Sequence, residues 1–395
     1  MTYCIGIASL IALTSLSLSF GRLSDYSHFL RDTAFFKLHY LVFGIIFSLI
    51  VPEGFASDVS SLLLPGLFFC LTWIGLYFGV NIERFSHRLY PGRKTLFHIV
   101  EPVMMFFALM AAGSIYVSIT SRGAYMSETA ILIATAATFT LSRRHPSDRA
   151  GAHMIHPVIN DIPPVRNIVP IVIMCCVTYV LFGPIEVTVF QKPFSGLPTY
   201  LAGHILLGAG SGMLLGFAVR GSRSTDAFAG VFIGVTALTA GIANLLTLSP
   251  LLTGTLTGAF FINSSFDRVS VIEAVTLVNE IVERLFIMLL GFILVRIINP
   301  ELSLLGGIIL AVIGIVAVRT AVLFVIVYFW TRKAGYASKG WQLSWMGLTG
   351  QGILAAGAAA ELILRAPSHR VLFIILIGVM VINQTITAGY IYKNR

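Results

Sequence analysis

Three arginines within apolar stretches are the first residues of this chain whose placement points to chemistry. The chain has 26 lysine and arginine residues, and all except Arg284, Arg296 and Arg319 fall in predicted connections or near the chain ends. A charged side chain within hydrocarbon costs roughly 2.5–3.5 kcal/mol on insertion scales. Each of the three is therefore expected to reach an interface, to pair with an acid or to serve transport. Arg296 lies near the end of its stretch and can extend to the interface, and Arg284 follows Glu280 at the i,i+4 spacing that allows a pair.

Asp161, with Asn160 before it, is the strongest candidate for binding an ion. A carboxylate in a partly dehydrated cavity can hold either a proton or a cation, and the amide oxygen of Asn160 can ligate a hard cation. The alternative is structural, because Asp161 is followed by Pro163 and Pro164 and could cap a helix at the cytoplasmic edge. For Asp161 to lie within the membrane, its helix has to begin near Gly151.

Other polar and small residues have structural interpretations. Glu101 is expected early in its helix, where a carboxylate stabilises the N-terminus, and Glu361 is expected at the outer interface. Gly208, Gly212 and Gly216 form overlapping G-x-x-x-G steps, which predict a close-packing face that is either internal or a dimer contact.

The composition predicts an all-α polytopic membrane protein. The 395 residues are 57% hydrophobic and 11% charged, with a mean hydropathy of +0.90, whereas soluble domains carry about 25% charged residues. The net charge of +9 is spread over many short connections, which argues against nucleic-acid binding. The four cysteines lie in apolar segments and predict neither a disulfide framework nor a metal site. No cofactor is expected, and the chain is not expected to be an enzyme.

The elements that must position these residues are helices long enough to span a bilayer. Thirteen apolar segments are predicted: Tyr3–Phe20, Phe36–Val51, Leu62–Val80, Leu96–Ile119, Glu128–Leu141, Ala152–Cys176, Pro198–Val219, Ala227–Leu248, Pro250–Ile262, Glu280–Ile298, Leu302–Trp330, Trp341–Leu364 and Val371–Tyr392. The first is interpreted as a spanning helix, because it lacks a basic n-region and a small-x-small cleavage signal.

The basic residues of the connections orient these segments. With the N-terminus outside and the C-terminus in the cytoplasm, 19 basic residues face the cytoplasm and four face outward, which agrees with the positive-inside rule for a protein of the cell membrane. Segments one to six and eight to thirteen would form two halves of opposite orientation, since equivalent segments lie seven apart. Inverted repeats of this kind occur in many secondary transporters.

Several stretches, taken in order, resemble one family of transporters. They are His39–Gly44 with Val51-Pro52, Ile74–Glu83, Asn160-Asp161 in the sixth segment, Leu248–Gly254 with Thr257-Gly258-Ala259, and Arg319 in the eleventh segment. This series is similar to the cation:proton antiporter superfamily, the sodium/hydrogen exchangers, over nearly the whole chain. The resemblance implies exchange of Na⁺ or K⁺ for H⁺ at Asp161 and Asn160, and an Asn-Asp pair implies electroneutral exchange.

The resemblance also implies two helices that unwind within the membrane and expose carbonyl groups to the ion. Thr135 and Thr138 lie where the fifth helix would unwind, and Gly350, Gln351 and Gly352 lie where the twelfth would. Arg319 would balance the dipoles of the broken helices. The structural alternatives are close packing of small residues and an ion pair of Arg319 with a neighbouring acid. This chain lacks the Asp-Pro and Arg-Gly-Glu sequences common in the fifth and twelfth helices, which leaves the choice of ion open.

The family resemblance implies a homodimer with scaffold and core parts. Residues 1–95 and 226–300 would form the dimerisation scaffold, 96–190 and 301–395 the transport core, and 191–225 a linker helix. Three alternatives remain: a sodium-coupled symporter of an organic anion on a related fold, a channel-like pathway, and a transport-inactive relative that serves as a membrane sensor or partner.

Overall fold

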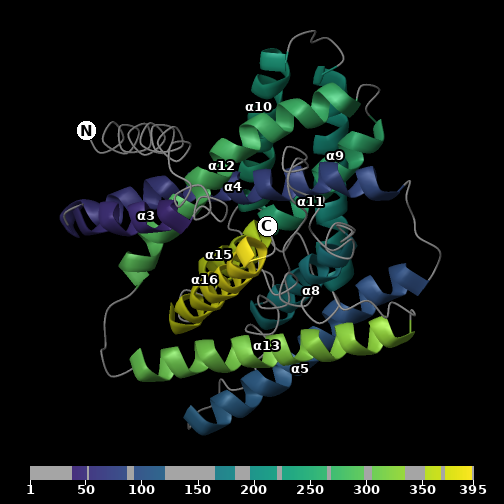
Figure 1. Cartoon of the computed structure of the whole chain (residues 1–395). Helices are drawn as coiled ribbons and strands as arrows, with labels where there is room; N and C mark the ends of the chain where they lie inside the picture. Colours follow the sequence, from purple (N-terminus) through teal and green to yellow (C-terminus); the bar gives the residue numbers. More distant parts are fainter. Residues whose placement is uncertain are drawn as a thin grey trace. The chain divides into compact units, whose positions relative to one another are not determined.

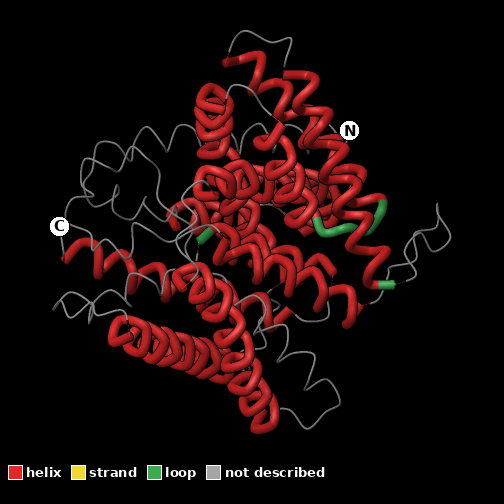
Figure 2. Tube along the Cα trace, turned by 90° about the vertical axis from the view of Figure 1, so that its right-hand side faces the viewer, coloured by secondary structure: helices red, strands yellow, loops and turns green. Residues whose placement is uncertain are grey.

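The computed structural model of the chain describes residues 38–50, 53–86, 93–120, 165–182, 196–219, 225–264, 268–297, 305–333, 352–365 and 370–393. Every regular element within these residues is an α-helix, as Figures 1 and 2 show. The predicted all-α class is confirmed there. The described helices overlap eleven of the thirteen predicted segments, and Tyr3–Phe20 and Glu128–Leu141 lie outside the described residues.

The helices group into two compact units, each formed from two separate parts of the chain. The first unit contains α3 (Leu38–Ile50), α4 (Glu53–Ser86), α9 (Leu197–Val219), α10 (Thr225–Leu245), α11 (Pro250–Ser264) and α12 (Arg268–Ile297). The second unit contains α5 (Arg93–Thr120), α8 (Val165–Phe182), α13 (Leu305–Lys333), α15 (Ile353–Arg365) and α16 (Arg370–Lys393).

The chain is a membrane protein by the length and apolar character of its helices. Four described helices contain stretches that can cross a bilayer, namely Leu63–Ile82, Leu197–Val219, Ala227–Leu245 and Gly306–Ile326. Large apolar side chains are exposed on these helices, for example Leu206 on α9 and Leu310 on α13. Such surfaces suit contact with lipid rather than water.

The first unit is held together by helix crossings at which backbones touch. A Cβ atom at Gly75 of α4 would collide with the carbonyl oxygen of Leu251 in α11, and one at Gly79 would collide with that of Thr255. Glycine is therefore required at both positions, because any side chain would force the helices apart. The residue numbers of the contacting positions increase together along both helices, so α4 and α11 run parallel.

The crossing of α3 with α12 repeats this arrangement. A Cβ atom at Gly44 of α3 would collide with the carbonyl oxygen of Met288 in α12, and one at Gly291 would collide with that of Leu41. Further along both helices, the rings of Phe47 and Phe292 lie 5.8 Å apart. These contacts define a second pair of helices packed backbone to backbone.

The G-x-x-x-G face of α9 packs within the first unit. A Cβ atom at Gly208 would meet Leu256 of α11, and one at Gly216 would lie 3.1 Å from the Ser264 hydroxyl. Of the two predicted uses of this face, the structure has the internal one. The glycines let α9 approach α11 closely.

Candidate functional site

Most of the predicted site lies outside the described residues. This holds for Thr135, Thr138, Asn160, Asp161, Gly350 and Gln351. The helix α8 begins at Val165, four residues after Asp161. Whether Asp161 caps a helix or lies within the membrane stays a prediction. Arg319 and Gly352 are described, and they are the starting points for the site.

Arg319 lies at the middle of α13, and its side chain is completely buried. It is the fifteenth of 29 residues in this helix, about 21 Å from either end at about 1.5 Å per residue. Its exposed fraction is 0%. A guanidinium this far from both helix ends cannot extend past them, and its burial shows that it faces the protein interior.

Gly352 marks a break in the predicted twelfth segment. The residue itself is not helical, and α15 begins directly after it at Ile353. The helix has 13 residues and spans about 20 Å, which is shorter than a hydrocarbon core of about 30 Å. The amide of Ala355 donates to the carbonyl of Gly352 at 3.0 Å, so the first turn is tight. The segment Trp341–Leu364 is therefore not one continuous helix.

Two glutamates of the second unit are buried, and the position of one of them contradicts its predicted role. Glu101 is the ninth residue of α5, which begins at Arg93, and only 1% of it is exposed. It lies more than two turns inside the helix, so the predicted capping role is wrong. The helix begins three residues before its predicted start at Leu96.

Glu361 of α15 is also buried. Its exposed fraction is 1%, and its Oε1 atom lies 3.3 Å from Nε of Arg365, one turn later. The interfacial position stays a prediction, and the structure adds that Arg365 supplies a counter-charge that lets the carboxylate stay enclosed by the protein.

These observations place the buried charges in one unit. Among the described residues, the charged side chains that are fully enclosed are Glu101, Arg319 and Glu361, and all three belong to the second unit. The buried polar side chains of the first unit are neutral, with hydroxyl, amide or imidazole groups. Buried charges are costly and are retained where a protein uses them, and among the described residues they are confined to the second unit.

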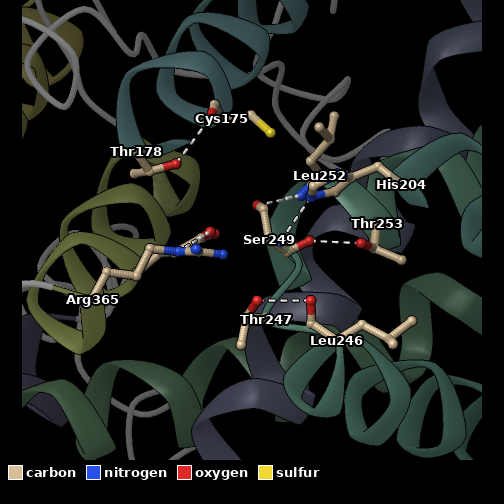
Figure 3. Close-up of polar contacts among 10 residues, drawn as sticks. Cys175, Thr178, His204, Leu246, Thr247, Ser249, Leu252, Thr253 and Arg365 are labelled. Carbon is tan, nitrogen blue, oxygen red and sulfur yellow. Dashed lines mark hydrogen bonds and ion pairs between the residues drawn. The ribbon is translucent and has the colours of Figure 1, made fainter. Parts of the chain in front are cut away.

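The first unit contains a buried hydrogen-bonded contact between α9 and the start of α11 that the sequence alone did not predict (Figure 3). The ring of His204 in α9 has an exposed fraction of 0%. Its Nε2 atom accepts the backbone N–H of Ser249 at 2.8 Å, and its Nδ1 atom lies 2.9 Å from the carbonyl oxygen of Tyr200. This pair of bonds assigns the neutral tautomer with the proton on Nδ1.

Ser249 explains why His204 matters. The Ser249 hydroxyl accepts the amide of Leu252 at 3.1 Å, and Pro250 is the first residue of α11, so Ser249 is the N-cap. In a capping box, a Glu or Gln in the first turn accepts the N–H of the N-cap residue. Here Leu252 occupies that position, and His204 accepts the N–H from another helix.

The turn before this cap is closed by a Schellman motif. The amide of Leu248 donates to the carbonyl of Ala243 at 2.8 Å, and that of Thr247 donates to the carbonyl of Asn244 at 3.1 Å. Thr247 has a φ of 54°, where glycine is the usual residue. The turn joining α10 to α11 is thus fixed by its own backbone and by His204.

A second polar group lies where α12 meets α3. Arg284 and Glu280 approach to 3.3 Å, so the predicted i,i+4 pair is confirmed. The Arg284 guanidinium also lies 5.9 Å from the centre of the Tyr40 ring, and Asn279 donates to Glu283 at 2.7 Å. These contacts favour a structural role for Arg284.

Within the described part of the chain, no group of three or more histidine, cysteine or acidic side chains is placed to hold a metal ion. No protein-family model matches the chain, and no curated protein matches it. Its structure is similar to that of the sodium proton antiporter MjNhaP1 from Methanocaldococcus jannaschii, with a TM-score of 0.61 and 16% identity. The match covers 99% of this chain and 95% of that chain. The chain therefore has a cation:proton antiporter-like fold, as the sequence resemblance predicted.

Proposed function

We propose that the chain is a secondary active transporter that exchanges a monovalent cation, Na⁺ or K⁺, for H⁺ across the membrane. The observation that carries this proposal is the fully buried Arg319 at the midpoint of α13, in a chain whose fold is similar to that of a sodium proton antiporter over nearly its whole length.

In the proposed mechanism, Asp161 binds a cation and a proton in turn. The two cannot occupy one carboxylate together, so uptake of one requires release of the other. Asn160 and Thr135 would supply neutral oxygen ligands to the cation. One carboxylate without a second acid beside it exchanges one charge for one charge, so the exchange is electroneutral. Access to Asp161 would alternate as the core moves against the scaffold.

Arg319 would compensate charge near this site. A fixed positive charge at the middle of α13 stabilises the ionised carboxylate and the negative ends of broken helices. Thr138 in the fifth helix and Gly350, Gln351 and Gly352 in the twelfth would form the unwound segments. The start of α15 directly after Gly352 supports a break at this point.

The inverted repeat and the thirteen-helix plan are supported by the crossings of the first unit. The second and third segments are α3 and α4, and the ninth and tenth are α11 and α12. If the repeat relates α3 to α11 and α4 to α12, the contact of α4 with α11 corresponds to the contact of α12 with α3. Both pairs cross backbone to backbone at glycines, Gly75 and Gly79 in one and Gly44 and Gly291 in the other. The division into two units supports the assignment of the first to the dimerisation scaffold and the second to the transport core.

The test is exchange in proteoliposomes containing a pH-sensitive dye. Na⁺, K⁺ and Li⁺ are added in turn to vesicles of the wild type, Asp161→Asn, Arg319→Gln and the control Glu273→Gln, whose side chain is exposed on α12. Cation-dependent proton movement is expected in the wild type and the control, and it is lost in Asp161→Asn. Equal activity in Asp161→Asn would remove Asp161 from the mechanism. Sodium-driven uptake of an organic anion without proton movement would identify the symporter instead, and no movement with any cation would favour the transport-inactive relative.

A further inference from the structure

We propose that the first unit contains a binding site for a single water molecule where α4, α10 and α12 meet. The site is formed by the indole N–H of Trp73, the hydroxyl of Thr236 and the amide oxygen of Asn279. It belongs to the unit without buried charges, and it does not rest on the proposed exchange function.

The three groups share burial without a hydrogen-bond partner inside the protein. The exposed fractions of Trp73 and Thr236 are 0%, and that of Asn279 is 4%. The Nε1 atom of Trp73, the Oγ1 atom of Thr236 and the Oδ1 atom of Asn279 make no hydrogen bond with another protein group. Buried polar groups are nearly always bonded to protein or to ordered water, so each of these atoms calls for a partner.

The hydroxyl of Thr236 differs from those of the other buried threonines of the first unit. Their hydroxyl groups donate to the carbonyl group one turn earlier in the same helix, which satisfies a threonine without any outside group. This holds for Thr72, Thr239, Thr253, Thr255 and Thr257. Thr236 makes no such bond, so its hydroxyl is available to a group outside α10.

The orientation of the Asn279 side chain is set by Glu283. The Nδ2 atom of Asn279 donates to the carboxylate of Glu283, one turn later, at 2.7 Å. This bond identifies which end of the amide is the nitrogen, and the Oδ1 atom is the end that does not face the carboxylate. The site thus has an acceptor from α12, a donor from α4 and a hydroxyl from α10.

The contact of α4 with α11 gives the position of Trp73 along the first unit. Trp73 directly follows Thr72, and a Cβ atom at Gly254 of α11 would collide with the carbonyl oxygen of Thr72. Trp73 therefore lies near the level of Gly254.

The contact of α10 with α11 gives the position of Thr236. The two helices are joined by the turn at residues 246–249, and they meet again at Phe232 and Phe261, whose rings lie 5.1 Å apart. They therefore run antiparallel. Thr236 is one turn closer to the connecting turn than Phe232 is, so it lies near the level of residue 257, within about one turn of the level of Trp73.

The course of α12 gives the position of Asn279. Three residues separate the end of α11 at Ser264 from the start of α12 at Arg268. The helix α12 packs against α4 and α10 and runs back toward α3, where Met288 meets Gly44. Asn279 lies about 17 Å from the start of α12, and the same distance back along α11 from Ser264 leads to residue 253. All three groups therefore lie at about one level, in the part of the first unit where Figure 1 shows α4, α10 and α12 converging.

The chemistry of the three groups selects the ligand. The indole N–H of Trp73 only donates a hydrogen bond, the Oδ1 atom of Asn279 only accepts one, and the hydroxyl of Thr236 can do either. A cation cannot accept the indole N–H. A water molecule can accept from Trp73 and donate to Asn279 and Thr236, and about three bonds are what a buried water makes. The site therefore suits one water molecule.

The water joins three helices at one point. It continues the hydrogen bond between Glu283 and Asn279 from α12 to α4 and α10, so that sliding one helix along another breaks at least one bond. Buried polar networks in which every group is satisfied rigidify a core and specify one arrangement. The site thereby fixes the register of the three helices.

The first arm of the test is direct observation. A diffraction map of the protein at a resolution that shows ordered water should contain one peak within hydrogen-bonding distance of all three atoms. A direct bond between two of the three side chains, or the lack of a shared peak, would overturn the proposal. A peak that gains an anomalous signal when Na⁺ and K⁺ are replaced by Rb⁺ would identify a cation and would equally overturn it.

The second arm is a double-mutant cycle on the midpoint of thermal unfolding in lipid. Thr236→Val keeps the shape of the side chain but removes one bond to the water, and it should lower the midpoint by about 2–4 °C. Because Trp73 binds the same water, this effect should be about halved when Thr236→Val is combined with Trp73→Phe. The control Thr239→Val loses a bond to the carbonyl of Val235 at 2.8 Å and should have the same effect in both backgrounds. Additive effects of Thr236→Val and Trp73→Phe would show that the two residues share no ligand.

Discussion

Replacing His204 with phenylalanine tests the hydrogen-bonded contact between α9 and the start of α11. Phenylalanine keeps a ring of similar shape but cannot accept the N–H of Ser249, which the imidazole binds at 2.8 Å. The carbonyl of Tyr200, 2.9 Å from Nδ1, keeps a donor in the substituted protein, because it also receives the backbone amide of residue 204 within the helix. The substitution therefore leaves one buried donor without a partner.

The expected cost follows from this single lost bond. A buried backbone N–H without an acceptor costs about 1–3 kcal/mol, and Ser249 has an exposed fraction of 0%, so water cannot replace the imidazole. This energy corresponds to local opening of the turn that is about fivefold to 150-fold more frequent. A glutamine at position 204 has an amide oxygen that can accept the same N–H, and it should recover part of the loss.

The assay is hydrogen–deuterium exchange of the intact protein in lipid, followed by mass spectrometry of peptides from residues 243–253. Faster exchange is expected in this region for His204→Phe, a smaller change for His204→Gln, and none in peptides from α13. Equal protection in wild type and His204→Phe would refute the assignment of the imidazole as a cap. Uniform loss of protection over all helices would show a general packing defect and would equally contradict a local role.

Three further substitutions test the packing and the caps. Thr247→Gly should stabilise the protein by about 1 kcal/mol, because it relieves a left-handed backbone, and the midpoint of thermal unfolding should rise. Gly75→Ala should destabilise the protein by more than about 3 kcal/mol, because the new Cβ meets backbone rather than a movable side chain. The control Gly234→Ala, with nothing within 4 Å of its Cβ, should be neutral or stabilising. The yield of folded protein on gel filtration compares the two variants. Glu361→Gln should lower the free energy of unfolding by about 3 kcal/mol, because it leaves Arg365 without its buried partner. Adding Arg365→Gln should recover most of the thermal stability. Equal thermal stability of the wild type and Glu361→Gln would contradict a stabilising role for the pair.

The spanning helices and the Glu280–Arg284 pair could be predicted because both depend on local sequence. Hydrophobic length and i,i+4 spacing are properties of one segment, and they hold whatever the segment packs against. The G-x-x-x-G steps of α9 predicted a contact but not its partner, which is α11. A small-residue face states only that something approaches closely.

The burial of Glu101 and the role of His204 could not be predicted from single segments. The start of α5 at Arg93 moves Glu101 from the second turn to the third, whereas the sequence pattern places the basic residues at positions 93 and 94 in a connection. Ser249, the partner of His204, is 45 residues later in the chain, after α10. A histidine in an apolar helix has no local signal that separates a cap from a core residue, so only the fold brings donor and acceptor together.

The distribution of tight contacts and buried charges argues for a division of labour between the two units. The first unit meets backbone to backbone at Gly75, Gly79 and Gly44, and contacts of this kind cannot change without separating helices, because interiors are close-packed. Its buried polar side chains are neutral, and hydroxyls such as that of Thr253 bond to the preceding turn of their own helix. The second unit holds the enclosed charges Glu101, Arg319 and Glu361, and charged groups are costly to enclose in a protein. A rigid neutral unit combined with a charged one is what a transporter needs if its ion is to be bound and released by the part that moves, and this distribution supports the proposal that exchange takes place in the second unit.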